Sequence, residues 1–231
     1  MFDELLSNAI DSFLIRRAND STAKDLDVHF NLEFFDAELE GNVYDLRVSC
    51  ADNGAGFGSL ETKAFVTKDT SFKDDLGVEG IGRCKGTGRV QYFHFFNKLS
   101  VSSIFTEEGL TYERRLELSA GTKELDEDNF KVFPASGRSV GTTLTLDGIR
   151  DQFLTQLAPS SSIKEDLSAF ALKQHLLVNF LHRLVGLKEH IGDFSIRIQT
   201  NYKKSKPLIE EIGASDLPEL ASSPTLNVPY G

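Results

Sequence analysis

The stretch Glu4-Leu-Leu-Ser-Asn8-Ala-Ile-Asp11-Ser12 lies close to the amino terminus and organises the rest of the chain. Glu4, Asn8 and Asp11 recur at i, i+4 and i+7, so on a helix they form one polar stripe. The opposite side is apolar and consists of Leu5, Leu6, Ala9, Ile10 and Phe13. This pattern predicts a helix that packs on a sheet and shows two carboxylates and a carboxamide to a cavity. A solvated helix face can carry the same spacing, so the stretch alone does not decide a function.

Three further motifs follow along the chain. Asp52-Asn-Gly54-Ala-Gly56-Phe57 comes directly after an alternating apolar run, so an acid and two glycines stand where a buried strand should end. The glycine-rich stretch Gly80-Ile-Gly82-Arg83-Cys-Lys85-Gly86-Thr87-Gly88-Arg89 precedes a predicted helix start, where unpaired N–H groups can bind anions. A plain surface turn is the alternative interpretation of these glycines. Gly141-Thr142-Thr143-Leu144 completes the set.

Composition restricts the class of protein. The 231 residues include 25 Lys and Arg against 35 Asp and Glu, a net charge of −10, so the chain as a whole repels nucleic-acid phosphates. We therefore do not expect nucleic-acid binding by this part of the protein alone. Cys50 and Cys84 have neither metal nor disulfide spacing, which indicates a cytoplasmic location. The sequence predicts no membrane span.

The periodicity of apolar residues predicts an α+β fold. Residues 28–34 and 44–50 alternate as the two strands of a hairpin, and further strands are expected at residues 99–105, 110–118, 130–133, 142–146 and 194–198. Residues 163–187 predict a long helix with Phe170, Leu181 and Leu184 on its apolar stripe.

The four motifs in this order resemble those of the GHKL ATPases, the superfamily of gyrase B subunits, the ninety-kilodalton heat-shock chaperone, sensor histidine kinases and mismatch-repair ATPases. The resemblance covers roughly residues 1–150, and it is nearest to mismatch-repair-like and microrchidia-like bacterial ATP-binding proteins. It implies the Bergerat ATP-binding fold, a two-layer α/β sandwich with a mixed, mostly antiparallel sheet and helices on one face. Residues 1–157 would then form the ATP-binding domain and residues 158–202 a helix plus strand extension packing on the same domain. Residues 203–231 would be a tail or the start of a further domain.

The resemblance also implies a role for each matching residue. Glu4 corresponds to the general base that orients water and Asn8 to the magnesium ligand, and Asp11 stands where the family has an acid or a small residue near the ribose and its bound waters. Asp52 corresponds to the acceptor of the adenine amino group, and Thr142 to a hydroxyl that shares a water with it. The remaining matches would contact the base at Gly54 and Gly56 and the phosphates at Gly82, Lys85, Gly86, Thr87, Gly88 and Arg89.

These roles predict a module that binds and hydrolyses ATP with Mg²⁺ and closes a lid at residues 65–85. Closure would drive dimerisation or a conformational change in a larger protein, in DNA maintenance or defence. The expected partners are ATP, a second copy in a nucleotide-dependent homodimer, and a downstream domain. The alternatives are a histidine-kinase-type catalytic domain and a nucleotide-binding module without turnover. Glu4 favours hydrolysis over a kinase, because a kinase needs no water-activating base. The second-domain lysine that completes the site in some members is not recognisable in these 231 residues.

Overall fold

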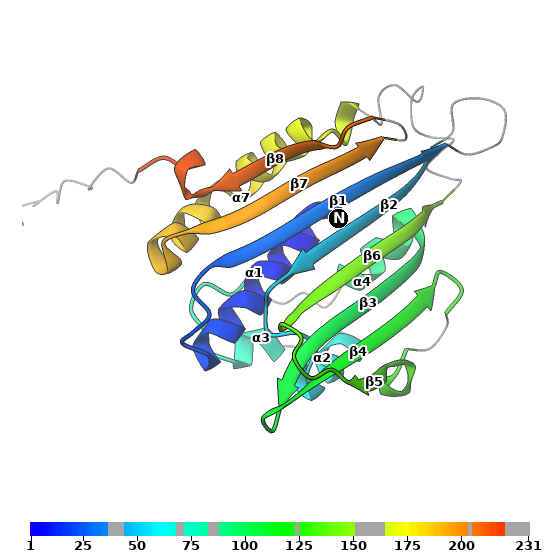
Figure 1. Cartoon of the computed structure of the whole chain (residues 1–231), viewed down its shortest axis with the longest axis vertical. Helices are drawn as coiled ribbons and strands as arrows, with labels where there is room; N and C mark the ends of the chain where they lie inside the picture. The colour runs from blue at the N-terminus through cyan, green and yellow to red at the C-terminus, as the bar shows by residue number, and fades with distance from the viewer. Residues whose placement is uncertain are drawn as a thin grey trace, which may run out of the picture.

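The computed structural model describes residues 1–36, 44–67, 72–82, 88–122, 125–150, 165–202 and 205–219 (Figure 1). The strands are β1 (Leu26–Asp36), β2 (Tyr44–Asp52), β3 (Phe96–Glu107), β4 (Leu110–Ser119), β5 (Lys131–Pro134), β6 (Gly141–Ile149), β7 (Phe194–Tyr202) and β8 (Leu208–Gly213). The helices are α1 (Phe2–Asn19), α2 (Ser59–Val66), α3 (Phe72–Asp75), α4 (Gly88–Phe95) and α7 (Ala169–Ile191), with 3₁₀ turns at Glu127–Asn129 and Ala214–Asp216.

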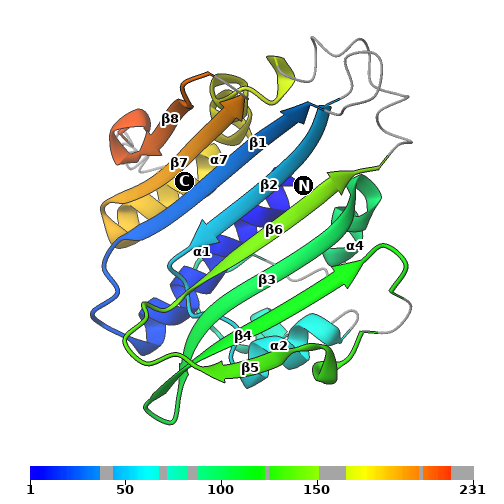
Figure 2. The same cartoon turned by 45° about the vertical axis from the view of Figure 1, so that its right-hand side comes forward.

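The strands form one sheet in the order β5-β4-β3-β6-β2-β1-β7-β8. Among the described strands every neighbouring pair is antiparallel except β1 and β7, which run parallel. Figures 1 and 2 show α1, α2, α4 and α7 on one side of this sheet, and none of the described helices lies on its other side. The predicted α+β class, with a mixed, mostly antiparallel sheet and helices on one face, is confirmed. No helix of the described part of the chain is long and apolar enough to cross a membrane.

The core lies between the helix layer and the sheet. In β1 the apolar residues Leu26, Val28, Phe30, Leu32 and Phe34 are buried, because alternate side chains of a strand point to the same face. The apolar residues of α1 that the sequence indicated belong to the same core: Leu5, Leu6, Ala9, Ile10 and Phe13. Burial of these two apolar surfaces against each other fixes α1 across the middle of the sheet, with its polar stripe to one side.

The predicted hairpin is present. β1 and β2 pair antiparallel with Val28 opposite Asp52, so Asp52 is the last residue of its strand, as the sequence indicated. The strands expected around the turn at residues 107–109 also pair antiparallel, with Glu107 opposite Leu110.

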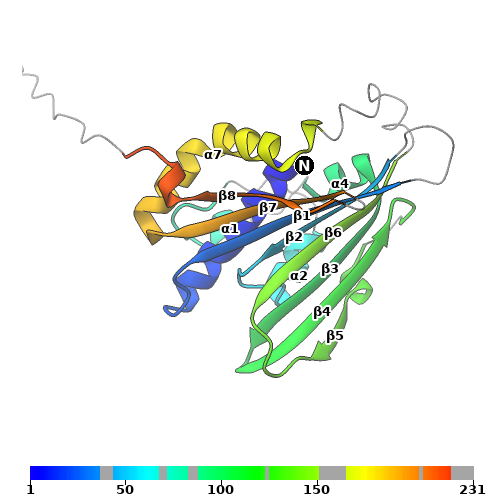
Figure 3. The ribbon, with the colours of Figure 1, turned by 45° about the horizontal axis from the view of Figure 1, so that its top comes forward.

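Two features of the carboxyl-terminal part differ from the sequence prediction. α7 begins at Ala169 with Ser168 as its N-cap, and it buries Leu172, Leu176, Leu184 and Leu187, whereas Phe170 is 61% exposed and Leu181 is 42% exposed. The helix is therefore rotated relative to the predicted stripe, because docking on β7 and β8 decides which face is covered (Figure 3). Leu208–Gly213, in the stretch indicated as a tail or a further domain, instead pairs antiparallel with β7 as an edge strand of the same sheet.

Candidate functional site

The polar stripe of α1 carries a short chain of hydrogen bonds. Asn8 Nδ2 donates to Glu4 Oε1 at 3.1 Å, as the i, i+4 spacing allows. Asn8 Oδ1 accepts a hydrogen bond of 2.7 Å from Nζ of Lys73, a residue of α3. The structure thus brings Glu4 and Asn8 together, and it adds a lysine that the sequence did not single out.

Asp11 lies deeper on the same stripe, and its side chain is only 2% exposed. Its Oδ2 accepts from Lys73 Nζ at 2.7 Å, and its Oδ1 accepts from the Gly82 N–H at 3.0 Å and from Arg183 Nη2. Arg183 comes from α7 and also donates to Ser7 Oγ at 2.7 Å. A buried carboxylate is costly unless it is paired, and two cations and a backbone amide meet that need here. Both oxygens of Asp11 are thus engaged by the protein, and the ribose role implied by the resemblance stays a prediction.

Asp52 stands at the other end of the candidate site. Its Oδ1 accepts a hydrogen bond from the Gly54 N–H at 2.8 Å. Burial raises the pKa of Asp52 to about 7, and the hydrogen bond from Gly54 opposes that rise. The carboxyl group therefore changes its charge near neutral pH.

A row of polar side chains continues from Asp52 across the helix-covered face of the sheet. Asp52 lies opposite Thr142 of β6, and Thr142 lies opposite Ser103 of β3, so the three side chains point to the same face. Thr142 Oγ1 and Ser103 Oγ are 2.9 Å apart, and Ser103 Oγ accepts from the Phe57 N–H at 2.8 Å. Thr142 is therefore beside Asp52, as its predicted role requires, and Ser103 holds both Thr142 and the loop after Asp52.

Gly54 and Gly56 have structural reasons to be glycine. A Cβ atom at Gly54 would lie 2.2 Å from Ser12 Oγ, and one at Gly56 would lie 2.3 Å from the Ile104 carbonyl oxygen. Gly56 also has φ of +78°, a conformation that side chains disfavour. Loop 52–57 is thus pressed between α1 and β3, and Ser12 accepts the Ala55 N–H through both Oγ and the backbone oxygen, each at 3.1 Å.

Arg114 is a further buried residue of this region that the sequence did not single out. It lies opposite Ser103 on β4, and its Nη1 donates to the Phe57 and Gly58 carbonyl oxygens and to Thr62 Oγ1. Its guanidinium group also lies 4.6 Å from the centre of the Phe105 ring. Arg114 and Ser103 occupy inward positions of otherwise apolar strand faces. A polar residue at a position where the strand alternation calls for an apolar one is the sequence signal that could have identified them.

The glycine-rich stretch is described only in part. Gly82 donates to Asp11, and Gly88 begins α4, so a helix does follow this stretch. Lys85, Gly86 and Thr87 and the side chain of Arg89 fall outside the described residues, so their phosphate roles stay predictions. Tyr92, the fifth residue of α4, is buried. Burial and the nearby negative charge of Glu4 raise the pKa of Tyr92, which places α4 beside the amino-terminal end of the α1 stripe.

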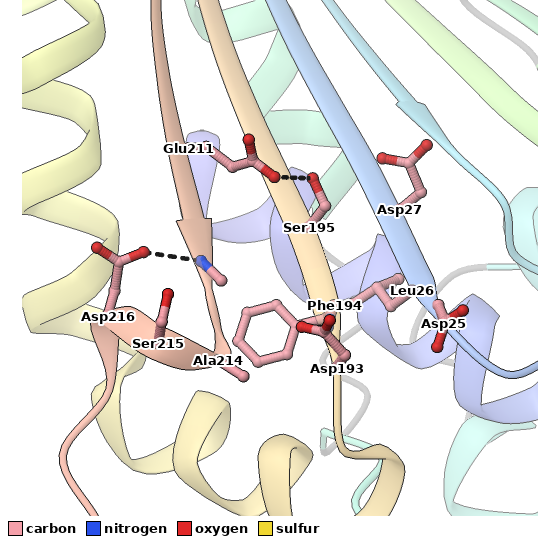
Figure 4. A pocket seen from close by; sticks show the side chains of 11 residues that line it. Asp25, Leu26, Asp27, Asp193, Phe194, Ser195, Glu211, Ala214, Ser215 and Asp216 are labelled. Atoms are coloured by element: carbon pink, nitrogen blue, oxygen red, sulfur yellow. Dashed lines mark hydrogen bonds between the residues drawn. The ribbon is translucent and has the colours of Figure 1, made fainter.

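A cavity of about 740 Å³ lies elsewhere, where β1, β7 and β8 meet the turn at Ala214–Asp216 (Figure 4). Its walls carry Asp25, Asp27, Asp193, Glu211 and Asp216, whose charges would repel phosphates. Ser195 Oγ donates to Glu211 Oε1 at 2.7 Å, and the Gly213 N–H donates to Asp216 Oδ2 at 2.9 Å. This cavity does not fit a nucleotide.

The α1 stripe does fit a metal that is carried by phosphates. Asn8 Oδ1 already accepts a hydrogen bond from the positively charged Lys73 ammonium, and a neutral amide oxygen suits a hard cation whose charge is balanced by phosphates. Within the described ranges no group of three or more His, Cys, Asp or Glu side chains is arranged to hold a metal by itself. Asn8 is thus the residue that would hold Mg²⁺, with phosphate oxygens and water completing its coordination.

No protein-family model matches the chain, and no curated protein sequence matches it. Among solved structures, the chain is similar to the N-terminal domain of a DNA repair protein, with 17% identity and a TM-score of 0.44 over 90% of this chain and 50% of the other. It is also similar to the ATPase and transducer domains of DNA topoisomerase II from Balamuthia mandrillaris, with 21% identity and a TM-score of 0.43 over 69% of this chain and 38% of the other. The chain spans half or less of these two structures. The description of its fold rests on its own strand order and helix positions.

Proposed function

We propose that this chain is a magnesium-dependent ATP-binding and ATP-hydrolysing module of a larger protein. The observation that carries the proposal is the attachment of loop 52–57 to α1 at Ser12, one helical turn beyond Asn8. Asp52, which is proposed to bind the base, therefore belongs to the same packed unit as Glu4 and Asn8, which are proposed to serve hydrolysis. Asn8 and Asp52 are nevertheless 44 positions apart in the sequence. Such fixed placement is what a site that aligns a phosphate with water needs.

Asp52 would select the purine. A carboxylate oxygen accepts a hydrogen bond from the 6-amino group of adenine, whereas the 6-carbonyl group of guanine would face it as a second acceptor. Gly54 holds Oδ1, so the second oxygen of Asp52 is the acceptor proposed for the base. Thr142, next to it in the sheet, would share a water with it.

Glu4 and Asn8 would serve the hydrolysis step. Asn8 Nδ2 holds the Glu4 carboxylate in place, and from there Glu4 would accept the proton of the attacking water. Mg²⁺, when bound at Asn8 Oδ1, supplies positive charge that balances the phosphates. Closure over the bound nucleotide would drive association with a second copy or rearrangement of a downstream domain, in DNA maintenance or defence.

The proposal is tested by calorimetry of the full chain with ATP, ADP and GTP in the presence of Mg²⁺. We expect ATP and ADP to bind, GTP to bind much more weakly, and Asp52→Ala to abolish adenine-nucleotide binding. Asp27→Ala is the matched control, because it removes an exposed acid of β1 outside the site. Equal affinity for ATP and GTP, or an unaffected Asp52→Ala variant, would refute the proposed nucleotide site.

A further inference from the structure

Lys73 connects α3 to the proposed metal ligand. Its Nζ lies 2.7 Å from Asn8 Oδ1 and 2.7 Å from Asp11 Oδ2. The Lys73 side chain is 21% exposed and that of Asp11 is 2% exposed, so the ammonium reaches from the surface into a buried polar cluster. No other cation of the described chain donates to the Asn8 oxygen.

The ammonium and a metal would compete for the same oxygen. Mg²⁺ binds its ligands at about 2.1 Å, so a metal on Asn8 Oδ1 would lie within about 5 Å of Nζ as it is now placed. Two cations at that separation repel each other, more strongly where the protein excludes water. An amide oxygen that already accepts a short hydrogen bond is also a poorer ligand until the donor leaves.

We propose that Lys73 is an internal cation that occupies the metal ligand in the nucleotide-free chain and leaves Asn8 when Mg²⁺ binds with nucleotide. The inference rests on the proposed function and adds a regulatory contact to that site. Asp11 stays paired after Lys73 leaves, because Arg183 and the Gly82 N–H still hold its Oδ1. Departure of the lysine therefore leaves the buried carboxylate of Asp11 paired, and it removes the contacts that Lys73 makes with α1.

The test is a magnesium titration of ATP binding to the full chain, followed by calorimetry, for the parent and for Lys73→Met. Methionine keeps the length of the side chain without its charge, so the variant should reach half-saturation at a magnesium concentration about twofold to fivefold lower, the range for loss of one partly exposed ion pair. Lys63→Met, which removes an exposed lysine of α2, should leave the titration unchanged. Lys73→Arg, which retains a cation, should restore most of the magnesium requirement.

Two further measurements separate the possible failures. Thermal unfolding without nucleotide should show a lower midpoint for Lys73→Met than for Lys63→Met, because only Lys73 has partners in α1. An unchanged midpoint, an unchanged magnesium requirement, or weaker nucleotide binding in Lys73→Met would each overturn the inference, and the last would make Lys73 a phosphate ligand. ATP binding to the parent is also measured in excess EDTA, which removes magnesium. If the parent binds no nucleotide either with magnesium or in EDTA, the proposed function fails together with the inference. If the parent binds ATP but Lys73→Met has the same magnesium titration as the parent, only the inference is refuted.

Discussion

Asp52→Asn should change how the stability of the protein depends on pH. Burial raises the pKa of Asp52 from an ordinary value of 3.8 to about 7, so the folded chain keeps this carboxyl group protonated over a range in which the unfolded chain has ionised it. The unfolded state then binds fewer protons, and stability falls as pH rises through that window, by up to about 1.4 kcal/mol per pH unit. Asparagine keeps an oxygen for the Gly54 N–H and cannot ionise.

The measurement is urea unfolding of the nucleotide-free parent and of Asp52→Asn at pH 5, 6, 7 and 8. Between pH 5 and 7 the free energy of unfolding of the variant should rise relative to the parent by about 1 kcal/mol per pH unit, and the difference should level off above the folded-state pKa. Asp27→Asn is the control, because it removes an equal charge from an exposed position of β1. A constant difference between parent and Asp52→Asn at all four pH values would mean that Asp52 is ionised in the folded chain, and the reasoning from its burial would be wrong.

Two further predictions concern the α1 stripe and the packing of loop 52–57. Glu4→Ala should bind ATP and Mg²⁺ nearly as well as the parent and lose turnover by about 100-fold or more, because a general base acts on water. Asn8→Ala should weaken both binding and turnover. Calorimetry measures the binding and steady-state kinetics the turnover, and an active Glu4→Ala enzyme would mean that another residue is the base. Gly54→Ala should lower the free energy of unfolding by about 1–3 kcal/mol, because its Cβ would lie 2.2 Å from Ser12 Oγ. Gly186→Ala, in open space within α7, should raise it by about 0.5–1 kcal/mol, and a tolerated Gly54→Ala would contradict the close approach.

The sequence alone determined the local elements and one half of the candidate site. Alternation in β1 and β2 fixed both the hairpin and the position of Asp52 at the end of its strand, because a strand repeats every two residues. Helical spacing alone brought Asn8 within hydrogen-bond distance of Glu4, because residues four apart are neighbours on a helix. Each of these features depends on residues close together in the chain, where backbone geometry sets the distances.

Only the tertiary structure decided which partners these residues have. Lys73 and Arg183 meet at Asp11 although they come from α3 and α7, and Arg114 reaches loop 52–57 from β4. The tertiary structure also decided which face of α7 is covered and that β7 pairs parallel with β1. Both follow because α7 crosses the helix-covered side of the sheet before β7 begins. Periodicity shows that a polar side chain stands on an apolar face. It cannot name the partner, because the partner is chosen by how whole elements pack their apolar surfaces against one another.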